Sequence, residues 1–304
     1  MKDKIEFGDC REIMRQWAKD GVKAQTCVTS PPYFGLRDYG HDGQIGLEQT
    51  PDEYIAAMVE VFRCVRDVLA DDGTVWLNVG DSYCNSNGFA RASEKYKRQG
   101  RENMPANDRS LDKLHESGFK TKDLIGIPWM LAFALRADGW YLRQDIIWHK
   151  PNPMPEPVRD RCTKAHEYVF LLSKSQKYYF DNDSIKEPAI YAGDDRGSRS
   201  DSRRGTIANS MSGVTGEYKN KRSVWTVSTK PYKGAHFAVF PPELITPCVL
   251  AGAPEGGVVL DPFMGSGTTA MVAKQNGRHY LGCELNQEYE SLQKERLDEL
   301  GRLF

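Results

Sequence analysis

The sequence predicts an α/β fold built on a doubly wound, mostly parallel sheet that polar inserts interrupt. Short apolar runs alternate with longer segments of helical periodicity, which is the order that places crossover helices between parallel strands. Two polar stretches rich in Gly, Ser and Asn, at 84–122 and 191–223, break this alternation. With 304 residues, the chain is long enough for one large domain with an insert, or for one and a half domains.

The expected elements follow one another in a regular order. Apolar runs predict strands at 5–9, 25–30, 74–79, 141–148, 167–172, 258–260 and 279–283. Helical periodicity predicts helices at 10–19, 51–71, 124–137, 242–251, 266–275 and 286–300. The second of these helices has the clearest start, because Thr50 can cap it, Pro51 suits its first turn and Glu53 completes a capping box.

The net charge of −1 conceals an uneven distribution. Residues 84–122 hold nine Lys and Arg against five Asp and Glu, and residues 191–233 hold nine against four. Because phosphate contacts are made by local basic patches rather than by net charge, an acidic body with two basic segments suits an enzyme that grips DNA. The same segments could also be ordinary solvated loops.

Cysteine usage and hydropathy exclude several classes of protein. The seven cysteines form no C-x-x-C pair, which argues against a zinc cluster or a disulfide framework, and no other metal constellation is visible. No apolar run approaches membrane-spanning length, and the N-terminus opens no leader-like run. We therefore expect a cytoplasmic protein with reduced thiols and no membrane partner.

A glycine loop follows the apolar run 258–260. Its glycines let the backbone approach a ligand closely, and the helix after it offers free N–H groups to a carboxylate. It lacks the Lys of a P-loop and the third Gly of a dinucleotide fingerprint, which disfavours triphosphate and pyrophosphate. An acid that ends the next strand can take both ribose hydroxyls. The pattern predicts a nucleotide-like cofactor, with candidate contacts at Asp261, Phe263, Gly265, Ser266, Gly267, Thr268 and Glu284, and at Thr29, which follows the apolar run 25–28.

A second loop, Ser30-Pro31-Pro32-Tyr33, follows the strand predicted at 25–30. An aromatic exocyclic amine is a poor nucleophile because its lone pair is delocalised, so a catalyst must accept hydrogen bonds from its N–H groups. The Ser30 hydroxyl and the Pro31 carbonyl can do this, the carbonyl being held rigidly by the two prolines. Tyr33 offers a flat face for a base taken out of the duplex. Together the loops suggest methyl transfer from S-adenosylmethionine to a base amine.

The order of these motifs resembles that of the amino-methylating DNA methyltransferases of the β class, in which the catalytic loop precedes the cofactor loop. The resemblance implies the Rossmann-like fold of S-adenosylmethionine-dependent methyltransferases, and double-stranded DNA as the substrate. It makes Ser30, Pro31, Pro32 and Tyr33 the catalytic residues. It also implies methyl transfer to a flipped base without a covalent enzyme intermediate. Such enzymes can work beside a restriction endonuclease of the same system, which would be a further partner.

Three other stretches resemble segments of that family. Gly8-Asp9-Cys10 is similar to the segment whose acid contacts the cofactor adenine, which makes Asp9 and Cys10 candidate contacts. The stretch 236–241 resembles the segment at the methionine end of the cofactor, with His236, Phe240 and Pro241 as candidates. The stretch 147–155, together with Arg161 and His166-Glu167, resembles the part that follows the catalytic core, where Lys150 is a candidate for DNA contact.

The resemblance also divides the chain. Residues 1–180 are expected to form the catalytic part with its polar insert at 84–122, and residues 236–304 the cofactor-binding part of the same domain. The insert at 181–235 lies where the family places its target-recognition region. Candidates there for phosphate or guanine contacts are Arg196, Arg199, Arg203 and Arg204.

The choice of amine is left open by the chemistry, since a Ser hydroxyl can serve either base. In the family, Ser before Pro-Pro-Tyr is typical of cytosine-N4 enzymes and Asp or Asn is typical of adenine-N6 enzymes, so cytosine is favoured. Methylation of RNA bases or of protein glutamine is a more remote alternative, because those enzymes usually place the cofactor loop first. A non-catalytic DNA-binding protein is a further alternative, which the intact Ser30–Tyr33 loop argues against. We interpret Pro247-Cys248 as part of a helix with a buried thiol, and Trp140 and Trp148 as core residues.

Overall fold

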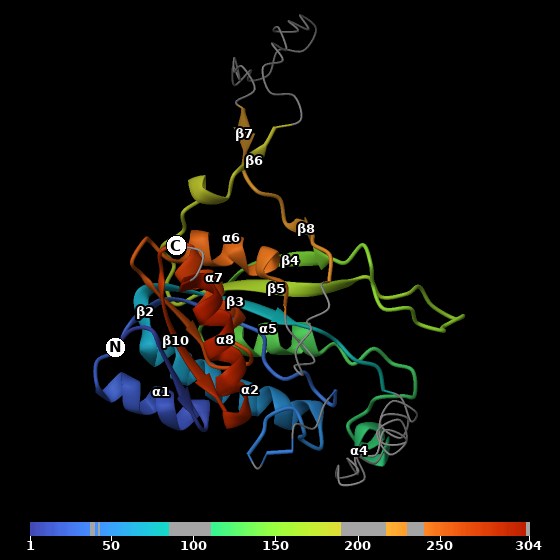
Figure 1. Ribbon diagram of the computed structural model, residues 1–304. Coiled ribbons are helices and arrows are strands. Elements are labelled where there is room, and N and C mark those ends of the chain that lie inside the picture. Colours follow the sequence, from blue (N-terminus) through green and yellow to red (C-terminus); the bar gives the residue numbers. More distant parts are fainter. Residues whose placement is uncertain (37–39, 42, 85–110, 190–216, 230–239, 302–304) are drawn as a thin grey trace, which may run out of the picture.

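The computed structural model describes residues 1–36, 40–41, 43–84, 111–189, 217–229 and 240–301. At its centre lies an eight-stranded sheet in the order β1-β10-β9-β2-β3-β5-β4-β8 (Figure 1). These strands are β1 (Lys4–Phe7), β2 (Ala24–Thr29), β3 (Leu69–Val79), β4 (Tyr141–His149), β5 (His166–Ser173), β8 (Val224–Thr226), β9 (Val258–Asp261) and β10 (His279–Glu284). Within the described sheet all pairs are parallel except the two that β5 makes, with β3 and β4. The predicted α/β fold with a mostly parallel sheet is confirmed.

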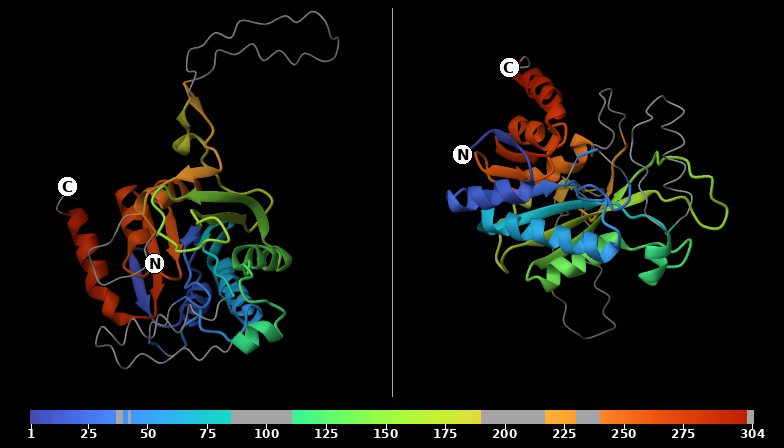
Figure 2. Two further views of the ribbon diagram at one scale, coloured as in Figure 1. Left: turned by 90° about the vertical axis from the view of Figure 1, so that its right-hand side faces the viewer. Right: turned by 90° about the horizontal axis from the view of Figure 1, so that it is seen from below.

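Helices cover both faces of the sheet (Figures 1 and 2). Hydrophobic side chains join one face to α1 (Cys10–Lys19), α2 (Pro51–Val68) and α5 (Ile127–Ala137). A second cluster joins the other face to α6 (Pro242–Gly252) and α7 (Thr268–Gln275), with α8 (Glu290–Gly301) packed on α7. The short helix α4 (Leu111–Glu116) lies within the predicted polar insert. This three-layer arrangement leaves the carboxyl ends of the parallel strands at one edge, where ligands bind in such folds.

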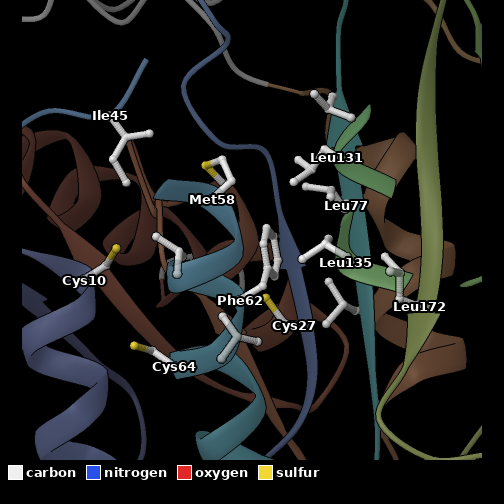
Figure 3. Packing of buried hydrophobic residues seen from close by; sticks show 14 of the residues in the cluster. Cys10, Cys27, Ile45, Met58, Phe62, Cys64, Leu77, Leu131, Leu135 and Leu172 are labelled. Atoms are coloured by element: carbon white, nitrogen blue, oxygen red, sulfur yellow. The ribbon is translucent and has the colours of Figure 1, made fainter. Parts of the chain in front are cut away.

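The larger core cluster fills the space between α2 and the sheet (Figure 3). Met58 and Phe62 of α2 are fully buried against Cys27 of β2 and Leu77 of β3. Completely burying a side chain of this size stabilises the fold by roughly 1.5–3 kcal/mol. Trp140, Trp148 and Cys248 are also buried, as predicted.

The helix starts and ends follow local chemistry. Asp9 caps α1 by accepting from the backbone N–H of Arg11, and the Thr50–Glu53 capping box of α2 is present as predicted. The predicted end of α2 near residue 71 is wrong: the helix ends at Val68, and Leu69 is extended and begins β3. The fully buried Leu69 pairs with Ala24 of β2, so the residues from Leu69 onward join the sheet instead of continuing the helix.

The boundaries near the C-terminus also shift. Helix α7 begins at Thr268 rather than at Ser266, because Gly267 adopts a left-handed conformation with φ 86°. The predicted helix 286–300 starts as a 3-10 turn, η2 (Gln287–Tyr289), and continues as α8.

The predicted insert 181–235 is only partly described. Its described part holds a 3-10 turn, η1 (Asp183–Ile185), and an antiparallel stem of β6 (Glu187–Pro188) and β7 (Tyr218–Lys219). It also holds β8, which pairs with β4 in the central sheet. Part of the stretch expected to serve DNA therefore belongs to the main fold. Among the described residues, no helix combines the length and apolar character that crossing a membrane requires.

Candidate active site

The two loops singled out in the sequence meet at the carboxyl edge of the sheet. Strands β2 and β9 are neighbours and parallel, with Cys27 opposite Leu260, so both chains leave the sheet side by side. The Thr29 hydroxyl donates to Oδ1 of Asp261 at 2.6 Å. The Thr269 hydroxyl donates to Oδ2 of the same carboxylate, also at 2.6 Å. One buried carboxylate thus connects the Ser30 loop to both sides of the glycine loop.

Asp261 is suited to join the loops rather than to face a ligand. Only 2% of the residue is exposed, and Oδ1 also accepts from the backbone N–H of Phe263 at 3.0 Å. Burial raises the pKa of Asp261 to about 6, although its three hydrogen bonds act in the opposite direction. Both oxygens are occupied by groups of the chain itself. Asp261 and Thr29, both candidate cofactor contacts, are thus bonded to each other and join the two loops.

The glycine loop is fixed from two sides. Its first glycine, Gly265, has φ 55°, donates its N–H to Oε2 of Glu284 at 2.7 Å and accepts at its carbonyl from the Gln293 amide at 2.7 Å. Arg296, also on α8, donates to the Thr268 hydroxyl. Burial raises the pKa of Glu284. Helix α8 therefore contacts the loop through Gln293 and Arg296, and Glu284 of β10 contacts it through the Gly265 N–H.

Polar groups at this loop fit a bound cofactor. The Ser266 hydroxyl is buried and has no hydrogen-bond partner in the described part of the chain. The N-cap of helix α7 is Gly267, which has no side chain to cap it, so the first N–H groups of the helix can receive an anion. A buried hydroxyl normally has a partner, and an uncapped helix start normally finds one. Both observations indicate that a polar ligand completes the loop.

Asp9 and Cys10 lie beside this loop. The Gly8 N–H donates to the Glu284 carbonyl at 2.8 Å, which places Asp9 at the same edge as Glu284. The carboxylate of Asp9 pairs with Arg11 at 2.5 Å, and this ion pair lowers its pKa. Cys10 turns into the core (Figure 3), where burial raises the pKa of its thiol to about 12. Cys10 can therefore contribute its backbone but not a reactive thiolate.

The Ser30 loop is held by a second set of contacts. The buried Tyr54 of α2 donates its hydroxyl to the Pro32 carbonyl at 3.0 Å. Gly46 packs so closely that an added Cβ would lie 3.3 Å from Cβ of Pro32. Pro31 is buried and Ser30 is half-buried. The loop is thus held in place at Pro32.

The chain matches the family model described as DNA methylase over residues 24–295. It is 50% identical to the type II methyltransferase M.SmaI of Serratia marcescens over 294 residues, 97% of this chain and 90% of that protein. It is 46% identical to M.Cfr9I of Citrobacter freundii over 290 residues, 95% of this chain and 86% of that protein. The chain belongs to the DNA methylase family.

Solved structures agree with this assignment at the level of the fold. PvuII DNA methyltransferase (cytosine-N4-specific) superposes with a TM-score of 0.62 at 16% identity, covering 97% of this chain and 86% of that one. The M1.HpyAVI–SAM complex gives a TM-score of 0.58 at 17% identity, covering 97% and 98%. The resemblance inferred from the motif order is thereby confirmed for family and fold.

In this DNA methylase, three polar side chains surround the Tyr33 hydroxyl, and of these only Ser30 was assigned a role from the sequence. Its hydroxyl donates to Oε2 of Glu167 at 2.8 Å and faces Oδ1 of Asn78 at 3.3 Å, while the Ser30 hydroxyl lies 3.4 Å away. Burial and the Glu167 charge raise the pKa of Tyr33 well above its usual value, so it is a neutral phenol. An added Cβ at Gly80 would lie 2.5 Å from Cε2 of Tyr33, which shows that the ring packs against this backbone.

Of the remaining candidate residues, some lie in the described part of the chain and some lie outside it. Lys150, the candidate for DNA contact, pairs with Oε1 of Glu167, and its Nζ lies 4.2 Å from the centroid of the Trp148 ring. Phe240 packs on the second core cluster, and Pro241 occupies the N-cap position of α6. Outside the described residues lie His236, Arg196, Arg199, Arg203 and Arg204.

Three residues of the site were missed in the sequence, namely Asn78, Gly80 and Tyr54. Asn78 and Gly80 could have been found, because a buried polar side chain and a glycine at the carboxyl end of a predicted parallel strand are typical of ligand sites. Tyr54 gave no such signal, since its place in the apolar stripe of α2 predicts only a core residue.

Proposed function

We propose that this DNA methylase transfers a methyl group from S-adenosylmethionine to the exocyclic N4 amine of a cytosine that is flipped out of double-stranded DNA. The observation that carries the proposal is the hydrogen-bonded bridge from Thr29 through Asp261 to Thr269. It brings the Ser30 hydroxyl, the amine acceptor, beside the loop whose polar groups suit the methyl donor. Donor and acceptor sites are then within reach of one another without a large rearrangement.

The chain supplies positioning and hydrogen bonding. When bound, S-adenosylmethionine supplies a methyl group already activated by its sulfonium. The Ser30 hydroxyl and the Pro31 carbonyl would accept the two N–H bonds of the amine and free its lone pair for in-line attack. The ring of Tyr33, held against Gly80, would stack on the flipped base. Effects of this kind require rigid acceptors, which the Tyr54 and Gly46 contacts of the loop provide.

Residues of the glycine loop would hold the cofactor. The N–H groups at the start of α7 and the Ser266 hydroxyl suit its carboxylate, and Glu284 suits the ribose hydroxyls. Glu284 would then exchange its bond to the Gly265 N–H for bonds to the ligand. Asp9, the N-cap of α1 just after β1, would contact the adenine.

Analysis of the modified nucleoside tests the proposal. The protein is incubated with labelled S-adenosylmethionine and unmethylated duplex DNA, RNA or protein, and the DNA is digested for mass spectrometry. N4-methylcytosine supports the proposal, and N6-methyladenine refutes it in favour of the adenine alternative. Label that enters only RNA or protein contradicts methylation of DNA bases altogether.

A further inference from the structure

Glu167 stands at the centre of a chain of contacts that reaches Ser30. Its Oε2 accepts from the Tyr33 hydroxyl at 2.8 Å and from the Asn78 amide at 3.3 Å. Its Oε1 pairs with the ammonium group of Lys150. Both side chains of this ion pair are mostly buried, with 18% of Lys150 and 16% of Glu167 exposed. A buried ion pair carries a desolvation cost, so its presence beside the Ser30 loop calls for a functional explanation.

The contacts give the hydrogen-bond chain one direction. The Asn78 amide nitrogen donates to the Tyr168 carbonyl at 3.0 Å, which turns its oxygen toward Tyr33. Tyr33 therefore faces two acceptors, the Glu167 carboxylate and the Asn78 oxygen, and must donate its single proton to that side. Its own oxygen is then left to accept from the Ser30 hydroxyl, 3.4 Å away. With its proton directed to Tyr33, the Ser30 hydroxyl keeps its lone pairs for a hydrogen bond from another group.

We propose that Glu167 is a positioning residue that orients the Tyr33 hydroxyl, so that Ser30 is presented to the substrate amine as a hydrogen-bond acceptor. The inference rests on the proposed function, because it assigns how the acceptor for that amine is oriented. It applies equally to a cytosine or an adenine amine, since both would donate an N–H to Ser30.

Lys150 fixes the carboxylate in this role. An ammonium group can only donate, so it always takes an oxygen of residue 167. With Glu167 the second oxygen remains for Tyr33. In Glu167→Gln the amide oxygen would turn to Lys150, and the amide nitrogen, a donor, would face Tyr33 and the Asn78 amide. The 2.8 Å acceptor of the Tyr33 hydroxyl would be lost and only the Asn78 oxygen at 3.3 Å would remain, although the side chain keeps its size.

Three substitutions, alone or in pairs, test this orientation. The rate of methyl transfer to long unmethylated DNA is measured with enzyme in excess, and S-adenosylmethionine affinity and Tm are measured separately. We expect Glu167→Gln to lower the rate about tenfold, the size of one lost charge-assisted hydrogen bond, with unchanged cofactor affinity. Adding Lys150→Met should recover part of the rate, because the amide oxygen is released to face Tyr33. In a Tyr33→Phe background, Glu167→Gln should cause no further loss.

Glu156→Gln is the matched control. Glu156 also pairs with a cation, Arg161 at 2.6 Å, and has no described contact with Tyr33, so the rate should not change. A normal rate in Glu167→Gln overturns the proposal. It is equally overturned if the loss is accompanied by weaker cofactor binding, is not relieved by Lys150→Met, or adds to that of Tyr33→Phe. Because the assay counts methyl groups on any base, a product other than N4-methylcytosine would refute the proposed function without deciding this inference.

Discussion

Replacing Asp261 by Asn should change how the stability of the protein depends on pH. The carboxylate is buried and bonded to two hydroxyls and one N–H, and none of these described partners is a cation. Asn has the same shape, and its amide can accept from one threonine while donating to the other, whose hydroxyl can rotate. The substitution therefore keeps the bridge between the two loops and removes only the charge.

The size of the effect follows from the pKa. Burial raises the pKa of Asp261 from 3.8 to about 6, a difference of about two units. Since each unit corresponds to ~1.4 kcal/mol, the folded state loses roughly 3 kcal/mol of stability when this group ionises. Because the folded pKa lies above the unfolded value, that stability is complete below pH ~4 and is lost as the pH rises through ~6. Asp261→Asn has no such loss.

Urea denaturation of both proteins at several pH values between 5 and 8 provides the measurement. The difference in the free energy of unfolding between Asp261→Asn and the natural protein should move in favour of the variant as the pH rises, and level off above pH ~7. Asp9→Asn is the control: Arg11 lowers the pKa of Asp9, so its titration lies below this range and its difference should stay constant. A constant difference for Asp261→Asn would show that the buried carboxylate does not carry the expected cost.

Three further substitutions test the Ser30 loop. Ser30→Ala should keep S-adenosylmethionine affinity, measured by calorimetry, and lose most of the methyl transfer; normal turnover would exclude the hydroxyl as the amine acceptor. Gly80→Ala should push the Tyr33 ring aside, since its Cβ would lie 2.5 Å from that ring, and lower kcat on the order of tenfold to a hundredfold at unchanged cofactor affinity. Tyr54→Phe leaves the Pro32 carbonyl without its 3.0 Å donor and should cost about 1–3 kcal/mol in urea denaturation; no loss of stability would mean that this contact does not hold the loop.

Most of the fold could be predicted because each element carries a local signal. The capping box at Thr50 and the apolar stripe of α2 fix that helix without any knowledge of its neighbours. The end of the same helix could not be predicted, because Leu69 is equally suited to a helix and to a strand. Its pairing with Ala24, on a strand distant in sequence, decides the outcome.

The parts of the site that consist of consecutive residues could be predicted. The contacts that depend on how distant strands pair could not. The loops at Ser30 and Gly265 are visible as motifs, and the alternation of strands and helices places both at one edge. Glu167 reaches Tyr33 across 134 residues only because β5 pairs with β3 at Asn78 opposite Val169. Such a contact depends on strand order and register, which the periodicity of a single sequence does not specify. The direction of β5, antiparallel within a parallel sheet, was likewise invisible.

The hydrogen bonds to Asp261 connect the Ser30 loop and the glycine loop directly. Thr29 precedes Ser30 directly, while Phe263 and Thr269 flank the turn at Gly265 and Gly267, and all three bond to the same carboxylate. A displacement of the glycine loop would have to move Asp261 and, with it, the backbone next to Ser30. The glycine loop and the Ser30 loop, 232 residues apart at Thr29 and Asp261, are therefore coupled through one buried group. Substitutions that break this bridge should impair cofactor affinity and methyl transfer together, whereas those at Glu167 should impair methyl transfer alone.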